Sequence, residues 1–176
     1  MIKKSEKSKT TTFVHDEEIF FVDADILGKL KLAAKKDPLG RSRLCLHRSH
    51  SDTVQEMIVA LRKGFYVRPH KHIGKTESFH IIEGAIVVVF FDDNGSVIRT
   101  LKMAHLGDNK PYIYRLSAEI WHTALPVTDF VIFHEIISGP FDRSSSEFPL
   151  WAPDENDTKG IRKYLDSLTP RVLSSV

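Results

Sequence analysis

Residues 64–84, which read GFYVRPHKHIGKTESFHIIEG, decide the fold predicted for this chain. Side chains two residues apart on a β-strand point to the same face, so His70 and His72 can present their imidazoles together. Glu77 follows a short link that contains Gly74. If this link reverses the chain, the carboxylate faces the two imidazoles from the neighbouring strand. The spacing therefore predicts a metal site with two nitrogen ligands and one oxygen ligand.

The ligand types indicate which ions can bind. Imidazole and carboxylate suit a borderline divalent ion, so we expect one Fe, Mn, Ni, Co or Zn ion. His122 lies in a later apolar run and is a candidate fourth ligand, because a closed barrel brings distant strands together. Two simpler interpretations stay open: the His-x-His pair as an exposed polar strand end, and the four residues as a closed structural zinc site.

Composition excludes several classes of protein. The 176 residues are enough for one domain with its own core, and basic and acidic residues are interspersed with a formal net charge of +2, so the sequence does not indicate nucleic-acid binding. The longest apolar run, residues 85–91, is far shorter than the ~20 residues of a membrane-spanning helix. We expect no membrane partner and, without a signal-peptide pattern, a cytoplasmic location.

The single cysteine, Cys45, rules out an intrachain disulfide and fits a reducing compartment. Two residues from His47, it is either a thiol near the site or, as is usual in an apolar strand, a core residue.

Short runs rich in β-branched and aromatic residues predict a mainly β protein. A cap at residues 23–25 precedes an amphipathic helix over residues 26–36, and residues 158–168 show the apolar spacing of a second helix. The turn Asp92-Asp93-Asn94-Gly95 indicates a hairpin. Many short strands at regular spacing indicate a sandwich or barrel. The predicted strands are residues 19–22, 44–47, 56–61, 65–72, 77–82, 85–91, 97–106, 112–116, 120–127 and 130–138.

These elements divide the chain into four parts. Residues 1–12 are expected to be a disordered basic tail, and residues 13–50 a strand and helix extension that packs on the barrel. Residues 51–142 form the barrel, and residues 143–176 form a C-terminal extension with a helix.

Three residues are candidates for catalysis. Tyr66 and Arg68 are in phase with the two histidines of the motif, so their side chains are expected to line the same cavity, and Arg115 is the third candidate. A tyrosine can act as a general acid, and an arginine can hold a carboxylate or phosphate with two hydrogen bonds. The alternatives are a packed tyrosine ring, and an arginine paired with Glu56 or Glu135.

Two further histidines are assigned from their strand faces. His134 alternates with apolar residues expected to point into the barrel, so it either supports a metal ligand by a hydrogen bond or is a satisfied core histidine. His80 lies three residues after Glu77, on the opposite face, and is left out of the metal set. Lys75, in the link, is expected to be an exposed loop lysine.

The spacing of residues 64–84 resembles the first cupin motif: a glycine, five residues, His-x-His, a short gap, a glutamate, six residues and a glycine. This resemblance implies the cupin double-stranded β-helix, a small jelly-roll barrel. The second cupin motif matches less well. Its histidine corresponds to His122, but Ser117, Glu119 and Pro126 stand where proline, glycine and asparagine are usual.

Residues 41–151 are similar to the WbuC family of cupin-fold metalloproteins. The similarity lies in RSRLCLH, PHKH, GKTESFHIIEG, FFDDNG, YIYRL, IWHT, FHEIISGPF and LWAP. It implies a link to bacterial surface polysaccharides, but no particular reaction.

We therefore expect a single-metal cupin that binds a small polar ligand related to a sugar or nucleotide-sugar, with isomerase or epimerase activity. The alternatives are an Fe(II) dioxygenase and a non-catalytic saccharide-binding module. The resemblance also implies a homodimer formed through edge strands.

Overall fold

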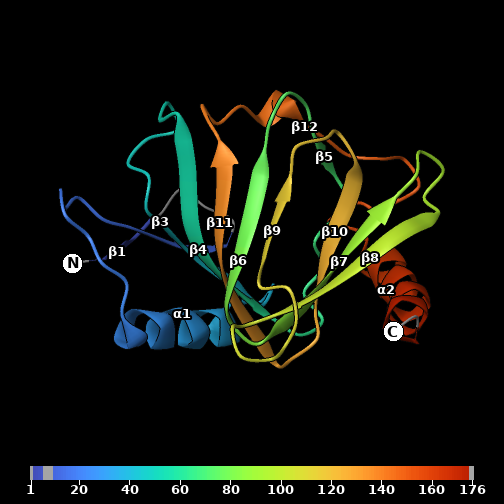
Figure 1. The fold of residues 1–176 in the computed structure, drawn as a ribbon, viewed down its shortest axis with the longest axis horizontal. Coiled ribbons are helices and arrows are strands. Elements are labelled where there is room, and N and C mark those ends of the chain that lie inside the picture. Colours follow the sequence, from blue (N-terminus) through green and yellow to red (C-terminus); the bar gives the residue numbers. More distant parts are fainter. Residues whose placement is uncertain (1, 6–9, 175–176) are drawn as a thin grey trace.

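Runs of β-branched and aromatic residues form the strands of a cupin double-stranded β-helix (Figure 1). The computed structural model describes residues 2–5 and 10–174. The helices are α1 (Ala24–Lys36) and α2 (Thr158–Ser174), with a 3₁₀ turn η1 (Arg143–Ser145). The strands are β1 (Lys3–Lys4), β2 (Thr11–Val14), β3 (Arg41–Cys45), β4 (Val54–Arg62), β5 (Lys71–His72), β6 (Glu77–Glu83), β7 (Ala85–Phe91), β8 (Val97–Ala104), β9 (Ile113–Leu116), β10 (Trp121–Pro126), β11 (Phe130–Ser138) and β12 (Ser146–Glu147).

Two sheets enclose the main core. The larger has the order β1-β2-β3-β4-β11-β6-β9, the smaller has the order β10-β7-β8, and β12 pairs with β5 in a separate two-stranded sheet. Alternate side chains from both sheets point inward, and the core they form includes Val59, Ile81, Val88 and Phe133. The barrel interior is therefore mostly apolar.

Each sheet is also covered on its outer face, by helices on opposite sides of the molecule (Figure 1). Helix α1 begins where the Asp23 carboxylate accepts the N–H of Ile26, and its buried Leu30 packs against the outer side of the larger sheet. Helix α2 buries Leu168 and Val172 against the smaller sheet. Within the described ranges, no helix has both the length and the apolar composition needed to span a membrane.

The N-terminal region differs from its prediction. Lys3–Lys4, expected in a disordered tail, pair with β2, which adds to the larger sheet in parallel with β3. Residues 6–9 of the expected tail lie outside the described residues. The Asp37 carboxylate accepts both the N–H and the hydroxyl of Thr11, at 2.8 and 2.9 Å. This long-range contact places the strand at Thr11–Val14, and residues 19–22, expected as a strand, form none.

The strand predicted at residues 65–72 is also shorter than expected. It is reduced to Lys71–His72 and one antiparallel bridge between His70 and His122. Pro69 has no N–H to donate to a ladder, and Gly64 turns the chain with a positive φ of 84°. The remaining predicted strands are present with ends shifted by three residues or fewer, and α2 extends beyond residue 168 to Ser174.

Candidate metal centre

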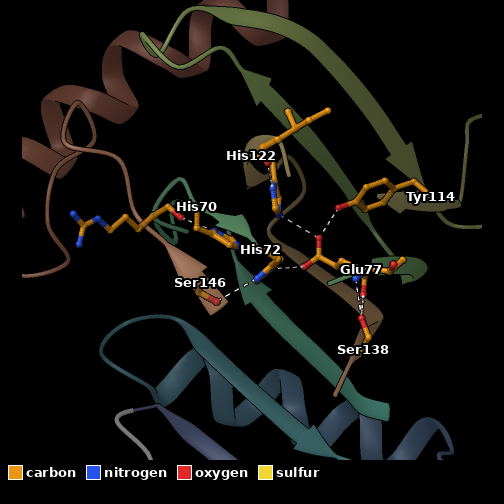
Figure 2. Close-up of polar contacts among 10 residues, drawn as sticks. His70, His72, Glu77, Tyr114, His122, Ser138 and Ser146 are labelled. Atoms are coloured by element: carbon orange, nitrogen blue, oxygen red, sulfur yellow. Dashed lines mark hydrogen bonds and ion pairs between the residues drawn. The ribbon is translucent and has the colours of Figure 1, made fainter. Parts of the chain in front are cut away.

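The four predicted ligands converge at one place, as Figure 2 shows. His70 and His72 come from the segment around β5, Glu77 begins β6, and His122 lies on β10. One potential ligand atom from each residue lies within 4.8 Å of all the others. Two ligand atoms bound to one ion are at most about 4.4 Å apart, so a contraction of a few tenths of an ångström lets the group hold a metal.

The link between β5 and β6 is fixed from two sides. Gly74 adopts a φ of +64°, and its N–H donates to Oε1 of Glu119 at 2.9 Å. On the other side, the N–H of Thr76 donates to Oγ of Ser138 at 2.8 Å. Glu119 is one of the positions that depart from the second cupin motif, and here it holds the turn that brings Glu77 to the histidines.

In the histidine rings, a hydrogen bond at Nδ1 leaves Nε2 as the nitrogen that can bind a metal. Nδ1 of His70 lies 2.8 Å from the Arg68 carbonyl oxygen, and Nδ1 of His122 lies 2.9 Å from that of Ile120. A carbonyl oxygen only accepts, so each Nδ1 carries the proton and each neutral ring has its lone pair on Nε2. Nδ1 of His72 lies 3.2 Å from Oγ of Ser146.

The Nε2 atoms that remain face the Glu77 carboxylate. Nε2 of His72 and of His122 is buried and makes no hydrogen bond within the described chain. Buried polar atoms without a hydrogen bond are rare and costly, and the nearby Glu77 carboxylate can pair with these nitrogens only when they carry a proton. Their convergence on Glu77 shows that the donor set fits a metal ion.

Glu77 is the anionic member of the group and is 2% exposed. Its two oxygens lie 3.3 Å from Nε2 of His122 and 3.6 Å from Nε2 of His72. Burial by itself raises the pKa of Glu77, but the interactions with His122 and His72 outweigh burial and hold this pKa well below its ordinary value. Three neutral imidazoles and one carboxylate leave a divalent ion with a net charge of one.

Tyr114 supports Glu77 and was not singled out from the sequence. Its hydroxyl donates to Oε2 of Glu77 at 2.7 Å (Figure 2). Burial, followed by the charge of Glu77, raises the pKa of Tyr114 far above its ordinary value, so the hydroxyl stays protonated and keeps donating. The alternation in YIYRL contained the signal, because Tyr114 and Arg115 must lie on opposite faces of β9.

Proton affinity differs between the histidines. Burial, followed by the charge of His122, lowers the pKa of His70 to about 3, so this ring is neutral at physiological pH. For His122, burial lowers the pKa, but Glu77 outweighs it and raises the pKa above the ordinary value. Protons and metal ions therefore compete for Nε2 of His122.

The three catalytic candidates lie in different surroundings. The Tyr66 hydroxyl donates to the Pro153 carbonyl at 2.9 Å, and the guanidinium of Arg68 forms an ion pair with Asp154 at 2.8 Å. Both side chains are therefore engaged with the C-terminal extension. Arg115 is exposed, on the face of β9 opposite Tyr114, which donates to Glu77, so it does not lie with the metal ligands.

β11 faces the opposite way from the prediction. Val131 and Phe133 belong to the barrel core, whereas Ile132 packs with α1 on the outer side. His134 therefore lies on the outer side, where its Nε2 is 2.7 Å from a carboxylate oxygen of Glu56, and it does not support the metal ligands. Glu135 takes the inward position instead.

The remaining polar candidates have simple roles. His80 is exposed and lies outside the metal group, in agreement with the face assigned to it. Lys75 is partly buried, and its ammonium donates to the carbonyl oxygens of Ser138 and Pro140. A groove of about 970 Å³ between α1 and the N-terminal strands contains none of the metal-site residues.

Comparison with known proteins supports the fold. A family described as "Domain of unknown function (DUF6016)" matches residues 22–103. No curated protein matches the chain in sequence. The protein SO0799 from Shewanella oneidensis superposes with a TM-score of 0.53 at 11% identity, over 74% of this chain and 84% of that one. At 11% identity, the similarity to SO0799 concerns the fold alone.

Two other solved structures match with lower TM-scores. The capsular polysaccharide assembling protein CapF from Staphylococcus aureus is 19% identical, with a TM-score of 0.46 over 56% of this chain and 27% of its own. Oxalate decarboxylase from Bacillus subtilis, which has Mn(II) centres, is 17% identical, with a TM-score of 0.43 over 55% of this chain and 24% of its own.

Proposed function

We propose that this cupin-fold chain binds one divalent metal ion through His70, His72, Glu77 and His122, and binds a small polar ligand at that metal. The observation that supports the proposal is the pair of buried Nε2 atoms without hydrogen bonds, both beside the Glu77 carboxylate. The metal would supply a Lewis acid for adjacent oxygen atoms of the ligand. The ligand set is compatible with Fe, Mn, Ni, Co or Zn.

Elemental analysis tests the metal directly. Protein purified without added metal is compared with His70→Ala and with the matched control His80→Ala, which changes an exposed histidine outside the group. We expect about one metal ion per chain in the wild type and the control, and loss of the metal in His70→Ala with the circular dichroism spectrum retained. A full metal content in His70→Ala would contradict the site.

For the ligand, we propose a sugar or nucleotide-sugar of bacterial surface polysaccharide biosynthesis, converted by isomerisation or epimerisation in the cytoplasm. The similarity of residues 41–151 to the WbuC family supports this choice. Turnover of a nucleotide-sugar panel by the metal-loaded protein is the test, with oxygen uptake by the iron-loaded protein as the readout for a dioxygenase.

A non-catalytic binding module is the second candidate. It is favoured by the engagement of the candidate acid–base residues elsewhere: Tyr66 with the Pro153 carbonyl and Arg68 with Asp154. Saturable sugar binding without product would support this module, and multiple turnovers would eliminate it.

We also propose that the chain forms a homodimer through an edge strand. β9 lies at the end of the larger sheet and carries Ile113, which is 55% exposed. A monomeric mass at micromolar concentration, measured by light scattering, would refute the dimer.

A further inference from the structure

Two arginines point into the barrel from β3. Arg41, Arg43 and Cys45 alternate on this strand and pair in register with Leu61, Val59 and Met57 of the barrel core. The intervening residues, Ser42 and Leu44, face α1 instead. Cys45 is buried, and burial raises the pKa of its thiol, so it is a packing residue. The two arginines are different: each is half-buried beside the apolar core, where a guanidinium is costly unless it is paired.

Glu135 lies between these arginines and the metal group. On β11 it is two residues before Ile137, which pairs with Glu77, and two residues after Phe133, which shares its core with the partners of β3. Burial and the charge of Glu77 raise the pKa of Glu135, and the charges of Arg41 and Arg43 lower it. Glu135 is therefore within electrostatic range of both groups.

The arginines are not fully compensated within the chain. Nε of Arg41 is buried and makes no hydrogen bond in the described chain. Its guanidinium lies 5.9 Å from the centre of the Phe65 ring, a weak partner for a charge. Nε of Arg43 donates to the hydroxyl of Thr12 at 3.1 Å, which is a neutral acceptor.

Charge complementarity points to an anion. Among the described residues, no carboxylate forms an ion pair with either guanidinium. Glu135 acts electrostatically on both guanidinium groups, and Glu155 also acts on Arg41, but neither carboxylate forms an ion pair with them. A guanidinium presents parallel N–H donors that match two oxygens of a carboxylate or phosphate.

We propose that Arg41 and Arg43 form an anion-binding subsite for a phosphate or carboxylate group of the ligand. The subsite itself is argued from the two arginines. The further statement that its ligand also binds the metal rests on the proposed function. It restricts the small polar ligand to anionic compounds. The competing explanation is structural: the arginines serve only to neutralise Glu135.

Calorimetric titration of the full-length protein with inorganic phosphate at low ionic strength tests the subsite. The variants are Arg41→Met, Arg43→Met and the control Arg99→Met, which removes an exposed arginine on β8. We expect Arg41→Met and Arg43→Met each to weaken phosphate binding at least about tenfold, and the control to leave it unchanged. Absence of phosphate binding in the wild type, or equal affinity in Arg41→Met, would overturn the proposal.

Thermal unfolding separates binding from a structural role. Without phosphate, Arg41→Met is expected to keep or raise the Tm, because it removes a buried donor that makes no hydrogen bond and a charge that forms no ion pair. Phosphate is expected to raise the Tm of the wild type but not of the variant. A lower Tm in Arg41→Met with the phosphate response retained would favour the structural explanation. If Arg41→Met does not fold, Arg41→Lys keeps the charge without the planar fork, and unchanged phosphate affinity in this variant would also count against the subsite.

The His70→Ala variant distinguishes the subsite from the metal site. We expect arginine-dependent phosphate binding to persist in this variant. A wild type that binds phosphate through Arg41 but contains no metal would contradict only the proposed function. A metal-loaded wild type without phosphate binding would contradict only the subsite.

Discussion

The hydroxyl of Tyr114 provides the sharpest test of how the metal site is organised. Tyr114 is 8% exposed, and its hydroxyl donates to Glu77 at 2.7 Å. Hydrogen bonds to charged groups contribute about 1.5–3 kcal/mol. Loss of a partner that orients a metal ligand typically weakens metal binding by about 10–100-fold, or about 1.4–2.7 kcal/mol. We therefore expect Tyr114→Phe to weaken metal binding by about 10–100-fold.

The substitution removes little besides this bond. The Tyr114 ring packs edge-on against Phe79 with centroids 5.1 Å apart, and phenylalanine keeps that contact. In the metal-free protein, the buried Glu77 carboxylate loses its hydroxyl donor, so a loss of about 1.5–3 kcal/mol should lower the Tm by about 3–12 °C.

Competition with a metal chelator at fixed pH measures the affinity, and thermal unfolding of the metal-free protein measures the stability. The matched control is Tyr112→Phe, two residues earlier, where the tyrosine is 37% exposed. Metal affinity in Tyr114→Phe within about twofold of the wild type would refute the role of this hydroxyl. An equal loss in both variants would refute it as well, because the effect would then not depend on Glu77.

Two other measurable consequences follow from the structure. Because Glu77 raises the pKa of His122, the stability this pair gives the metal-free protein is present below the unfolded pKa of about 6.5 and is lost as the pH rises through the raised pKa. Metal binding must displace that proton, so the affinity for the metal should weaken by up to about tenfold for each pH unit below the raised pKa. Chelator competition measures this affinity. A constant value from about pH 8 to about pH 6 would contradict the expectation. Gly84→Ala should destabilise the protein by at least about 2 kcal/mol more than Gly64→Ala in urea unfolding. Both glycines have a positive φ, but only at Gly84 does an added Cβ overlap the Phe130 carbonyl oxygen. Equal losses would show that the backbone relaxes around the overlap.

Local spacing was sufficient to predict most of the metal site. His70 and His72 lie two residues apart at β5, and Glu77 begins β6 just after the Gly74 turn, so alternation and one glycine turn bring them together. The structure places His122 with them through its pairing with His70. The sequence indicated His122 as a ligand only through the barrel expected for the fold, and it did not predict the pairing with His70, because no local pattern links residues so far apart in sequence.

Tertiary structure alone decided which face of each strand is inside. Both faces of β11 are apolar, because Phe133 packs in the barrel core and Ile132 packs beneath α1. A period of two then shows which residues share a face but not which face points inward, so His134 was predicted inside where Glu135 lies. Because of the same ambiguity on β9, Arg115 was chosen as a candidate and Tyr114 was not. The sequence by itself determined the ligand triad and the fold class, because both depend on short-range spacing. Which residues lie beside the metal ligands, and which lie beside Glu135, depends on how the helices cover the sheets. Only long-range packing decides this.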